Sequence, residues 1–361
     1  MKILILSPAP LSILPSQRFR FEQYIIEDNL PTDKVKFTHH SFFSIKTWKI
    51  LHVQGYTLQK LVGILFGFLK RLLMLFSISK YDFVYIHREA SPVGPPIFEW
   101  IIAKIIRKKI IYDFDDAIWV SGSSIANPKA GSFKCAWKVA KICKWSYIVT
   151  VGNKYLANYA SQFCKDVRVI PSVVNTEKVH KFIKNQNELP IVIGWTGTYT
   201  NFESLKKVDQ IIAKLQFKHN VKFLIIANKD PHLQSADYEY LQWNLTTEIQ
   251  DLLRMNIGIM PLEHTDVGLG KCAFKAIQYM SLGIPPIVSP VGANVQLVSN
   301  GVDGYFADNE NEWFLYLENL ILSKSLREEM GRQALKRIKN SYSVNSTQEE
   351  FFNLFNHNNI S

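Results

Sequence analysis

The chain has 361 residues, 47% of them hydrophobic, and a length near twice that of a common domain predicts two domains. Lys and Arg number 24 against 11 Asp and Glu over residues 1–176, a balance of +13, whereas residues 177–361 hold 18 against 20, or −2. This basic first half suits an anionic membrane surface or a phosphorylated substrate, with a generally basic soluble surface as the alternative. The absence of zinc-finger spacing and RNA-binding signatures argues against nucleic acid.

Neither a zinc site nor a disulfide framework is expected. The four cysteines, Cys135, Cys143, Cys164 and Cys272, form no C-x2-C pair and have no neighbouring His cluster. The N-terminal apolar run stops at Pro8, which is too short for a secretion signal and suits a first buried strand. We therefore expect reduced cysteines and a cytoplasmic protein.

Short apolar runs alternate with helix-like spacing through the first half of the chain. We expect strands at Ile3–Leu6, Val35–His39, Phe83–Ile86, Ile110–Tyr112, Tyr147–Val151 and Val167–Ile170. We expect helices at Glu99–Arg107, Phe133–Trp145 and Lys154–Phe163. Strands that alternate with helices are typical of a parallel sheet in a doubly wound α/β domain.

The segment Leu58–Ile78 is the most membrane-like part of the sequence. Its length would span a bilayer, but Lys70 and Arg71 lie at its centre, so we do not expect it to cross one. On a helical wheel, Lys60, Lys70 and Arg71 share one sector of about 100°, and apolar residues fill the rest. We expect either a helix that lies in a membrane interface or a core-packing helix with a narrow solvated basic edge.

The alternating pattern restarts near residue 190. We expect strands at Ile191–Trp195, Phe223–Ala227, Ile257–Pro261 and Ile284–Ser289, and helices at Glu203–Gln216, Thr246–Leu253, Lys271–Leu282, Glu312–Leu322, Ser325–Lys339 and Thr347–Phe355. The sequence therefore predicts two Rossmann-like domains, over residues 1–175 and 176–340, and a C-terminal segment, 341–361, that can pack back on the first. Because ligands bind beyond the carboxyl ends of parallel strands, we expect the two domains to face a shared cleft.

The segment from Gly268 to Gly292 is the richest candidate for binding chemistry. A glycine-containing loop leads into a helix expected to start near Lys271. Backbone N–H groups and the positive end of the helix dipole meet there, which suits a diphosphate. Lys275 follows one turn later, so both ammonium groups are expected to contact the same anion. Two solvated lysines on an ordinary amphipathic helix are the alternative.

This segment resembles the donor-binding segment of family 4 glycosyltransferases of the GT-B fold. In that family a Glu-x7-Glu motif precedes a helix end, a Gly-x-Pro turn and a strand, and Gln278, Met280, Gly283, Pro285 and Gly292 fill that frame here. The resemblance implies that the second domain binds a nucleoside diphosphate sugar and that the first binds an acceptor. It also implies retention of anomeric configuration, with no metal and no other cofactor in the protein site.

The sequence departs from the family at the two acidic positions of the motif. Gly270 stands in place of the first Glu and Gln278 in place of the second, which gives a Gly-Lys-x3-Lys-x2-Gln variant. A Gln can still hydrogen-bond a ribose hydroxyl, but it is neutral and also offers donors. A divergent subgroup is the preferred interpretation, and an inactive enzyme is the alternative.

Two further stretches resemble the family's nucleotide site. TGTYTN matches the phosphate loop of the donor domain, where Gly197 permits close backbone approach and Thr198 offers a hydroxyl donor. Trp243 lies where the family holds the nucleobase, so we expect it either to stack on the base or to pack in the core. Glu248, on the following helix, is expected on a solvated face.

Charged residues gather at the expected strand ends of the first domain. Arg18 and Arg20 follow the loop after the first strand, and their forked donors suit a phosphate, with a solvated helix start as the alternative. Asp113, Asp115 and Asp116 follow the strand at Ile110–Tyr112. Three neighbouring carboxylates repel one another, so we expect a metal, a base role or hydrogen-bonding partners to hold them.

The resemblance makes Asp115, Asp116 and His87 the catalytic candidates. Asp115 and Asp116 match the family's His-Asp strand end and would orient the sugar or the acceptor hydroxyl. Alternatively, Asp113-x-Asp115 is the metal-binding Asp-x-Asp of GT-A enzymes, or the cluster caps a helix. His87 resembles the family's strand-end histidine and would contact the acceptor, with a structural histidine as the alternative.

The predicted function is glycosyl transfer to a surface polysaccharide, a lipid-linked or a similar acceptor. A sugar-nucleotide epimerase of the same fold and a non-catalytic, membrane-associated relative are the alternatives. The expected partners are a nucleotide-sugar donor, a glycan or lipid-linked acceptor and an anionic membrane surface, and not nucleic acid. The expected location is the cytoplasm, peripheral on the inner face of the membrane.

Overall fold

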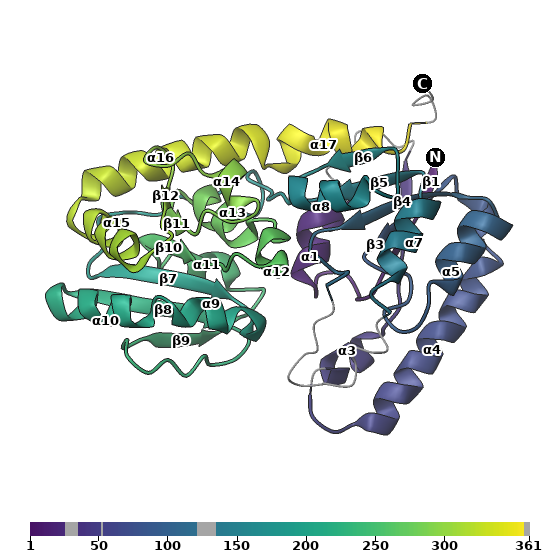
Figure 1. The fold of residues 1–361 in the computed structure, drawn as a ribbon, viewed down its shortest axis with the longest axis horizontal. Coiled ribbons are helices and arrows are strands. Elements are labelled where there is room, and N and C mark those ends of the chain that lie inside the picture. Colours follow the sequence, from purple (N-terminus) through teal and green to yellow (C-terminus); the bar gives the residue numbers. More distant parts are fainter. Residues whose placement is uncertain (26–34, 52, 121–134, 357–361) are drawn as a thin grey trace. The chain divides into compact units, whose positions relative to one another are not determined.

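A computed structural model describes residues 1–25, 35–51, 53–120 and 135–356, which form two compact units (Figure 1). The first unit comprises Met1–Ser172 and the residues from Gln348 onward, and the second comprises Val173–Thr347. The sequence-based boundaries, after residues 175 and 340, differ from these by three and seven residues.

The first unit is built on a parallel sheet with strand order β2-β1-β3-β4-β5-β6. Its strands are β1 (Lys2–Ser7), β2 (Lys36–Ser41), β3 (Phe83–His87), β4 (Lys109–Phe114), β5 (Ile148–Val151) and β6 (Val167–Val169). Each lies where an apolar run predicts it, with ends that move by at most two residues. The inner strands β1, β3, β4 and β5 are covered on both faces, which is why the sequence shows continuous apolar runs there and no alternation.

The helices of the first unit connect and cover these strands. They are α1 (Pro15–Gln17), η1 (Arg18–Glu22), α2 (Gln23–Ile25), α3 (Ile45–Leu51), α4 (Thr57–Leu75), η3 (Ile78–Lys80), α5 (Ile97–Trp100), η4 (Ile101–Ile105), α7 (Lys138–Trp145) and α8 (Lys154–Ala160). The predicted start of a helix at Phe133 lies outside the described residues. At the C-terminal end of the chain, Phe351 stacks on Tyr24 with ring centroids 4.2 Å apart, and Phe355 meets Phe83 at 6.0 Å.

The second unit repeats the architecture with strand order β12-β11-β10-β7-β8-β9. Its strands are β7 (Ile191–Gly197), β8 (Val221–Ala227), β9 (Glu239–Gln242), β10 (Ile257–Met260), β11 (Pro286–Val288) and β12 (Tyr305–Phe306). Its helices are η5 (Tyr199–Asn201), α9 (Phe202–Lys206), α10 (Asp209–Lys218), α11 (Glu248–Leu252), α12 (Asp266–Leu269), α13 (Phe274–Ser281), α14 (Asn294–Leu297), α15 (Glu310–Leu322), α16 (Lys324–Ser341) and α17 (Val344–Asn353), the last of which continues into the first unit. The edge strands β9 and β12 were not expected from the sequence.

Helix α4 contradicts one interpretation of the sequence. The basic sector does not form a solvated edge, because Arg71 is buried and donates hydrogen bonds to the carbonyl oxygens of Ser7, His40 and Ala90 at 2.9, 3.0 and 2.7 Å. The Lys70 ammonium likewise donates to a backbone carbonyl of the unit. The leucines on the opposite side are exposed. No described helix is both long enough and apolar enough to cross a membrane.

Candidate functional site

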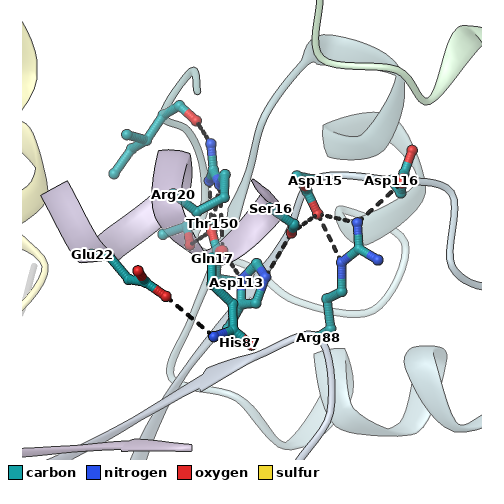
Figure 2. Close-up of polar contacts among 11 residues, drawn as sticks. Ser16, Gln17, Arg20, Glu22, His87, Arg88, Asp113, Asp115, Asp116 and Thr150 are labelled. Carbon is teal, nitrogen blue, oxygen red and sulfur yellow. Dashed lines mark hydrogen bonds and ion pairs between the residues drawn. The ribbon is translucent and has the colours of Figure 1, made fainter. Parts of the chain in front are cut away.

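In the first unit, three polar residues lie side by side across the carboxyl ends of neighbouring strands. The strand register pairs His87 of β3 with Asp113 of β4, and Asp113 with Thr150 of β5. His87 Nδ1 lies 2.7 Å from one Asp113 carboxylate oxygen, and the Thr150 hydroxyl donates to the other at 2.7 Å (Figure 2). All three side chains are buried. The carboxylate therefore fixes the orientation of the imidazole ring.

Arg20, which follows β1 in the chain, supplies the positive charge that balances Asp113. Its Nε lies 3.2 Å from Asp113 Oδ1, its Nη2 lies 2.5 Å from the same atom, and its Nη1 donates to the Ile170 carbonyl. Burial raises the pKa of the Asp113 carboxyl, but the Arg20 charge and the His87 hydrogen bond outweigh burial and hold that pKa well below its usual range. Asp113 is therefore ionised, and the forked donors that suggested a phosphate contact at Arg20 are used inside the protein.

Ser16 contacts Nε2 of His87, the ring nitrogen that does not contact Asp113. Its hydroxyl oxygen lies 2.7 Å from His87 Nε2 and 2.7 Å from Asp115 Oδ1 (Figure 2). Since a serine hydroxyl has one proton, it can donate to only one of these partners. When it donates to Asp115, it accepts from His87 Nε2. Ser16 therefore links His87 to Asp115.

Arg88 holds the two remaining carboxylates of the cluster. Its Nη2 donates to Asp115 Oδ1 at 2.7 Å and to Asp116 Oδ2 at 3.0 Å, and its own backbone has a positive φ of 60°. Burial raises the pKa of Asp115, but the Arg88 charge, together with His87, Ser16 and Arg20, outweighs burial and lowers that pKa to about 2. The Asp116 side chain is the most exposed of the three, at 28%. Asp115 and Asp116 thus form the edge of the cluster that a ligand can reach.

These contacts bear on the interpretations of the acidic cluster. Asp113 and Asp115 accept hydrogen bonds from Arg20, Arg88, Ser16 and Thr150, so protein donors occupy oxygens that an Asp-x-Asp metal site would use. Within the described ranges, no group of three or more His, Cys, Asp or Glu side chains could hold a metal ion. Hydrogen-bonding partners therefore keep the carboxylates together. Arg18 is also buried, with its guanidinium 4.7 Å from the Phe19 ring centroid.

In the second unit, the lysine-containing helix starts later than the sequence suggests. Helix α13 begins at Phe274, because Ala273 before it has a left-handed φ of 55°. Lys271 consequently lies in the connection from α12, where its N–H donates to the Gly268 carbonyl at 3.0 Å. The expected one-turn spacing of the two lysines along a single helix is therefore wrong. Lys275, and not Lys271, lies in the first turn.

Lys275 nevertheless reaches the loop that the sequence assigns to a phosphate. Its ammonium nitrogen lies 5.5 Å from the Trp195 ring centroid, at the carboxyl end of β7. A Cβ placed on Gly197 would lie 2.8 Å from Lys275 Cε and 2.5 Å from the Trp195 ring, so only glycine leaves this approach open. The loop after β7 also contacts the loop after β8, because Tyr199 donates its N–H to Asn228 Oδ1 at 2.9 Å. The structure thus brings Gly197 and Lys275 together, and Thr198 follows directly.

The other predicted site residues of this unit differ in whether they can contact a ligand. Gln278 is buried, and its Nε2 has no hydrogen-bond partner among the residues that the structure describes, so it is a donor that a ligand could satisfy. Gly270 ends α12 and donates its N–H to the Asp266 carbonyl at 3.0 Å. Trp243 packs against the core and donates its Nε1–H to Glu248 at 3.0 Å. Glu248 is buried, so the expectation that it lies on a solvated face is wrong.

The comparisons with known proteins point to one class of fold and domain. Residues 190–321 match the family described as glycosyl transferases group 1. Over 193 residues the chain is 27% identical to the capsular polysaccharide biosynthesis glycosyltransferase CapM of Staphylococcus aureus, a match to 50% of this chain and 48% of CapM. The chain therefore matches about half of the length of that curated relative.

Two solved structures extend the fold comparison over nearly the whole chain. A glycosyltransferase from Rickettsia africae is 14% identical, with a TM-score of 0.67 over 98% of this chain and 97% of that one. Anabaena HepE in complex with UDP-glucose is 13% identical, with a TM-score of 0.65 over 98% and 99%. The fold is GT-B, and residues 190–321 match the model of the glycosyl transferases group 1 family.

A glycine contact joins two loops of the second unit. Gly292, after β11, has a φ of 60°, and a Cβ there would lie 2.8 and 2.9 Å from the carbonyl oxygens of Leu269 and Gly268. Gly292→Ala is expected to lower the free energy of unfolding by about 2–3 kcal/mol, because it adds a backbone clash to left-handed strain. Gly301→Ala is the matched control, since Gly301 has a φ of 78° and nothing within 4 Å of its would-be Cβ. Chemical denaturation of both variants measures the difference, and equal losses would contradict the contact.

Three residues of these GT-B sites were missed by reasoning from the sequence. Ser16 contacts the catalytic candidates His87 and Asp115, Thr150 contacts Asp113, and Trp195 packs against Lys275. Thr150 gives a recognisable signal, since a hydroxyl interrupts an otherwise apolar buried strand. Trp195 directly precedes the TGT loop, and a large aromatic residue at a strand end is a comparable signal. Ser16 gives none, because its partners lie far along the chain.

Proposed function

We propose that this chain is a glycosyltransferase that moves a sugar from a nucleoside diphosphate sugar to a surface polysaccharide, a lipid-linked or a similar acceptor, with retention. The observation that supports it most directly is the approach of Lys275 to Gly197 within the group 1 domain. The ammonium group lies at the carboxyl end of a central parallel strand, where ligands of such sheets bind. CapM is named for capsular polysaccharide biosynthesis and HepE was solved with UDP-glucose, which supports the donor class.

The proposed donor site consists of residues of the second unit. Lys275 and Lys271 neutralise the diphosphate, and the Thr198 hydroxyl donates a hydrogen bond to it. Gly197 and Gly270 have no side chain that would exclude it from the backbone. Gln278 supplies its unsatisfied Nε2 donor to the ribose. We propose that Trp243 stacks on the nucleobase, with its indole held by a hydrogen bond to Glu248. Stabilisation of the leaving diphosphate needs no metal in this arrangement.

The proposed acceptor site is in the first unit. Asp115 and Asp116, at the accessible edge of the cluster, accept hydrogen bonds from the sugar or acceptor hydroxyl. His87 orients this edge through Ser16, while Asp113 fixes the ring. Arg18 is proposed to contact a phosphate of the acceptor or of the donor. Arg20 positions Asp113. The protein is proposed to work in the cytoplasm at the inner face of a membrane, where a lipid-linked acceptor would be presented.

Binding of nucleoside diphosphates tests the donor site. UDP, GDP, ADP and their sugars are added separately, and one of them is expected to raise Tm because a ligand of the native state stabilises it by about 2.7 kcal/mol at 100 times its Kd. The matching nucleoside monophosphate serves as the control, since it lacks the second phosphate that the lysines would contact. If no nucleotide shifts Tm, the donor site is wrong, and the non-catalytic relative takes its place.

Product analysis separates transfer from the epimerase alternative. The chain is incubated with the binding donor alone, and then with donor and a mixture of lipid-linked and glycan acceptors. Transfer predicts an intact donor in the first sample, apart from slow hydrolysis, and a glycosylated acceptor in the second. An interconverted sugar nucleotide in the first sample would contradict our proposal.

A further inference from the structure

Helix α4 has its apolar side facing away from the protein. Nine apolar side chains of α4 and its C-cap are between 49% and 82% exposed: Leu58, Leu61, Val62, Leu65, Phe66, Leu69, Leu72, Leu73 and Phe76. On a helical wheel they share one sector of about 140°. We call these nine residues the α4 apolar face. It extends along a helix of 19 residues, a length of about 28 Å.

The opposite side of α4 is fixed to the first unit, so the helix cannot rotate to bury its leucines. A Cβ on Gly63 would lie 2.3 Å from the Thr47 side chain, and one on Gly67 would lie 2.5 Å from the Phe42 ring, which shows how closely the helix is seated. Arg71 adds its three hydrogen bonds to backbone carbonyls. Figure 1 shows α4 as the long helix of the first unit, near α3 and α5.

The charge around this face favours an anionic surface as its occupant. Residues 35–81 contain six lysines and one arginine but no Asp or Glu. Two of the lysines, Lys46 and Lys49, are exposed on α3, which packs against α4, and Lys80 is exposed just beyond its C-terminal end. An exposed apolar helix face with exposed lysines on neighbouring segments is the combination that binds the headgroup region of an anionic bilayer.

A second copy of the chain fits this surface less well. In a two-fold symmetric interface the same patch meets itself, so the exposed lysines of α3 would face like charges. No acidic residue within residues 35–81 could pair with them. A lipid surface with negative headgroups has no such conflict.

We propose that the α4 apolar face inserts into the headgroup region of an anionic membrane, with Lys46 and Lys49 contacting the lipid phosphates. This assigns a surface to the membrane association in the proposed function. It contradicts the core-packing interpretation of the sequence, since the central basic residues of α4 hold the helix to the protein. Vesicle binding requires no donor, so the proposal can fail or succeed independently of glycosyl transfer.

Flotation with vesicles tests the proposal. The full chain is mixed with phosphatidylcholine vesicles that contain about 30 mol% phosphatidylglycerol, enough to give a negative surface potential, or none. The wild-type protein is expected to float with the anionic vesicles. The triple variant Leu65→Gln, Leu69→Gln, Leu72→Gln is expected to bind at least about tenfold more weakly, because it removes exposed apolar contact area. Lys46→Gln with Lys49→Gln is expected to weaken binding mainly at low salt.

The matched control removes exposed apolar residues elsewhere. Phe217→Gln with Leu322→Gln changes side chains that are 96% and 67% exposed in the second unit, and vesicle binding is expected to stay unchanged. Circular dichroism and an unchanged nucleotide-induced Tm shift report that the triple variant is folded. Equal flotation of the triple variant and the wild type would overturn the proposal. So would a wild-type dimer that ignores vesicles and becomes monomeric in the triple variant, because the occupant would then be a second copy.

Discussion

Asp113→Asn is expected to lower the free energy of unfolding by about 3–5 kcal/mol, because it leaves a buried guanidinium without its counter-charge. The Arg20 and Asp113 side chains are 1% and 0% exposed, so water cannot replace the lost partner. The Asn side chain keeps the size of the carboxyl and can still accept one hydrogen bond. We therefore attribute the lower free energy of unfolding to the missing charge and not to a cavity. Chemical denaturation at neutral pH measures it.

Asp116→Asn is the matched control for this prediction. It makes the same chemical change at a carboxylate that is 28% exposed and paired to a partly exposed arginine, so a loss below about 1 kcal/mol is expected. The double variant Arg20→Met, Asp113→Asn tests the cause, because removal of the unpaired guanidinium should recover part of the stability. If stability does not recover, the loss comes from the hydrogen bonds of Asp113 with His87 or Thr150.

The effect of Asp113 has a defined pH dependence. Its folded pKa lies below its usual value, so its contribution to stability is complete above the unfolded pKa of about 3.9 and is lost as pH falls toward the folded value. Asp115, with a pKa of about 2, acts in the same direction. The wild type and Asp113→Asn are therefore expected to differ by a constant amount at neutral pH and to converge below about pH 4. A difference that grows on acidification would contradict the ionised state of Asp113.

The strands were predictable because their signal is local. An inner strand of a covered parallel sheet is apolar on both faces, so the inner strands appear as short apolar runs. The edge strands β9 and β12 do not, since β9 reads EYLQ and β12 has two residues. The same local signal located the acidic cluster at the end of β4, because it follows directly on an apolar run.

The partners of those charges were not predictable, because they come from distant parts of the chain. Asp113 is held by Arg20, 93 residues earlier, and by Thr150, 37 residues later. The helical wheel of α4 separated basic from apolar residues correctly but could not tell which side meets the protein. The usual rule sends the apolar side inward. Here Arg71 is inside, because backbone carbonyls at the ends of β1 and β2 accept its hydrogen bonds.

Lys275→Ala is expected to lower kcat/KM of glycosyl transfer about 100-fold to 1000-fold, the usual loss when one fixed donor to a developing negative charge is removed. The ammonium group lies over Trp195 beside Gly197, where a leaving diphosphate would gain charge in the proposed reaction. The nucleotide-induced Tm shift is expected to fall as well. Lys275→Arg keeps the charge and should retain part of kcat/KM and part of the nucleotide-induced Tm shift.

Lys206→Ala is the matched control for Lys275. This lysine belongs to the same unit but is 52% exposed and pairs with Glu203 on its own helix, so its removal should leave transfer and nucleotide binding unchanged. Lys271→Ala separates the two candidate lysines. Because Lys271 lies before α13 and not within its first turn, a smaller loss than that of Lys275→Ala is expected. If Lys271→Ala abolishes nucleotide binding while Lys275→Ala leaves it intact, the diphosphate binds at the α12–α13 connection, and the packing of Lys275 on Trp195 is only structural.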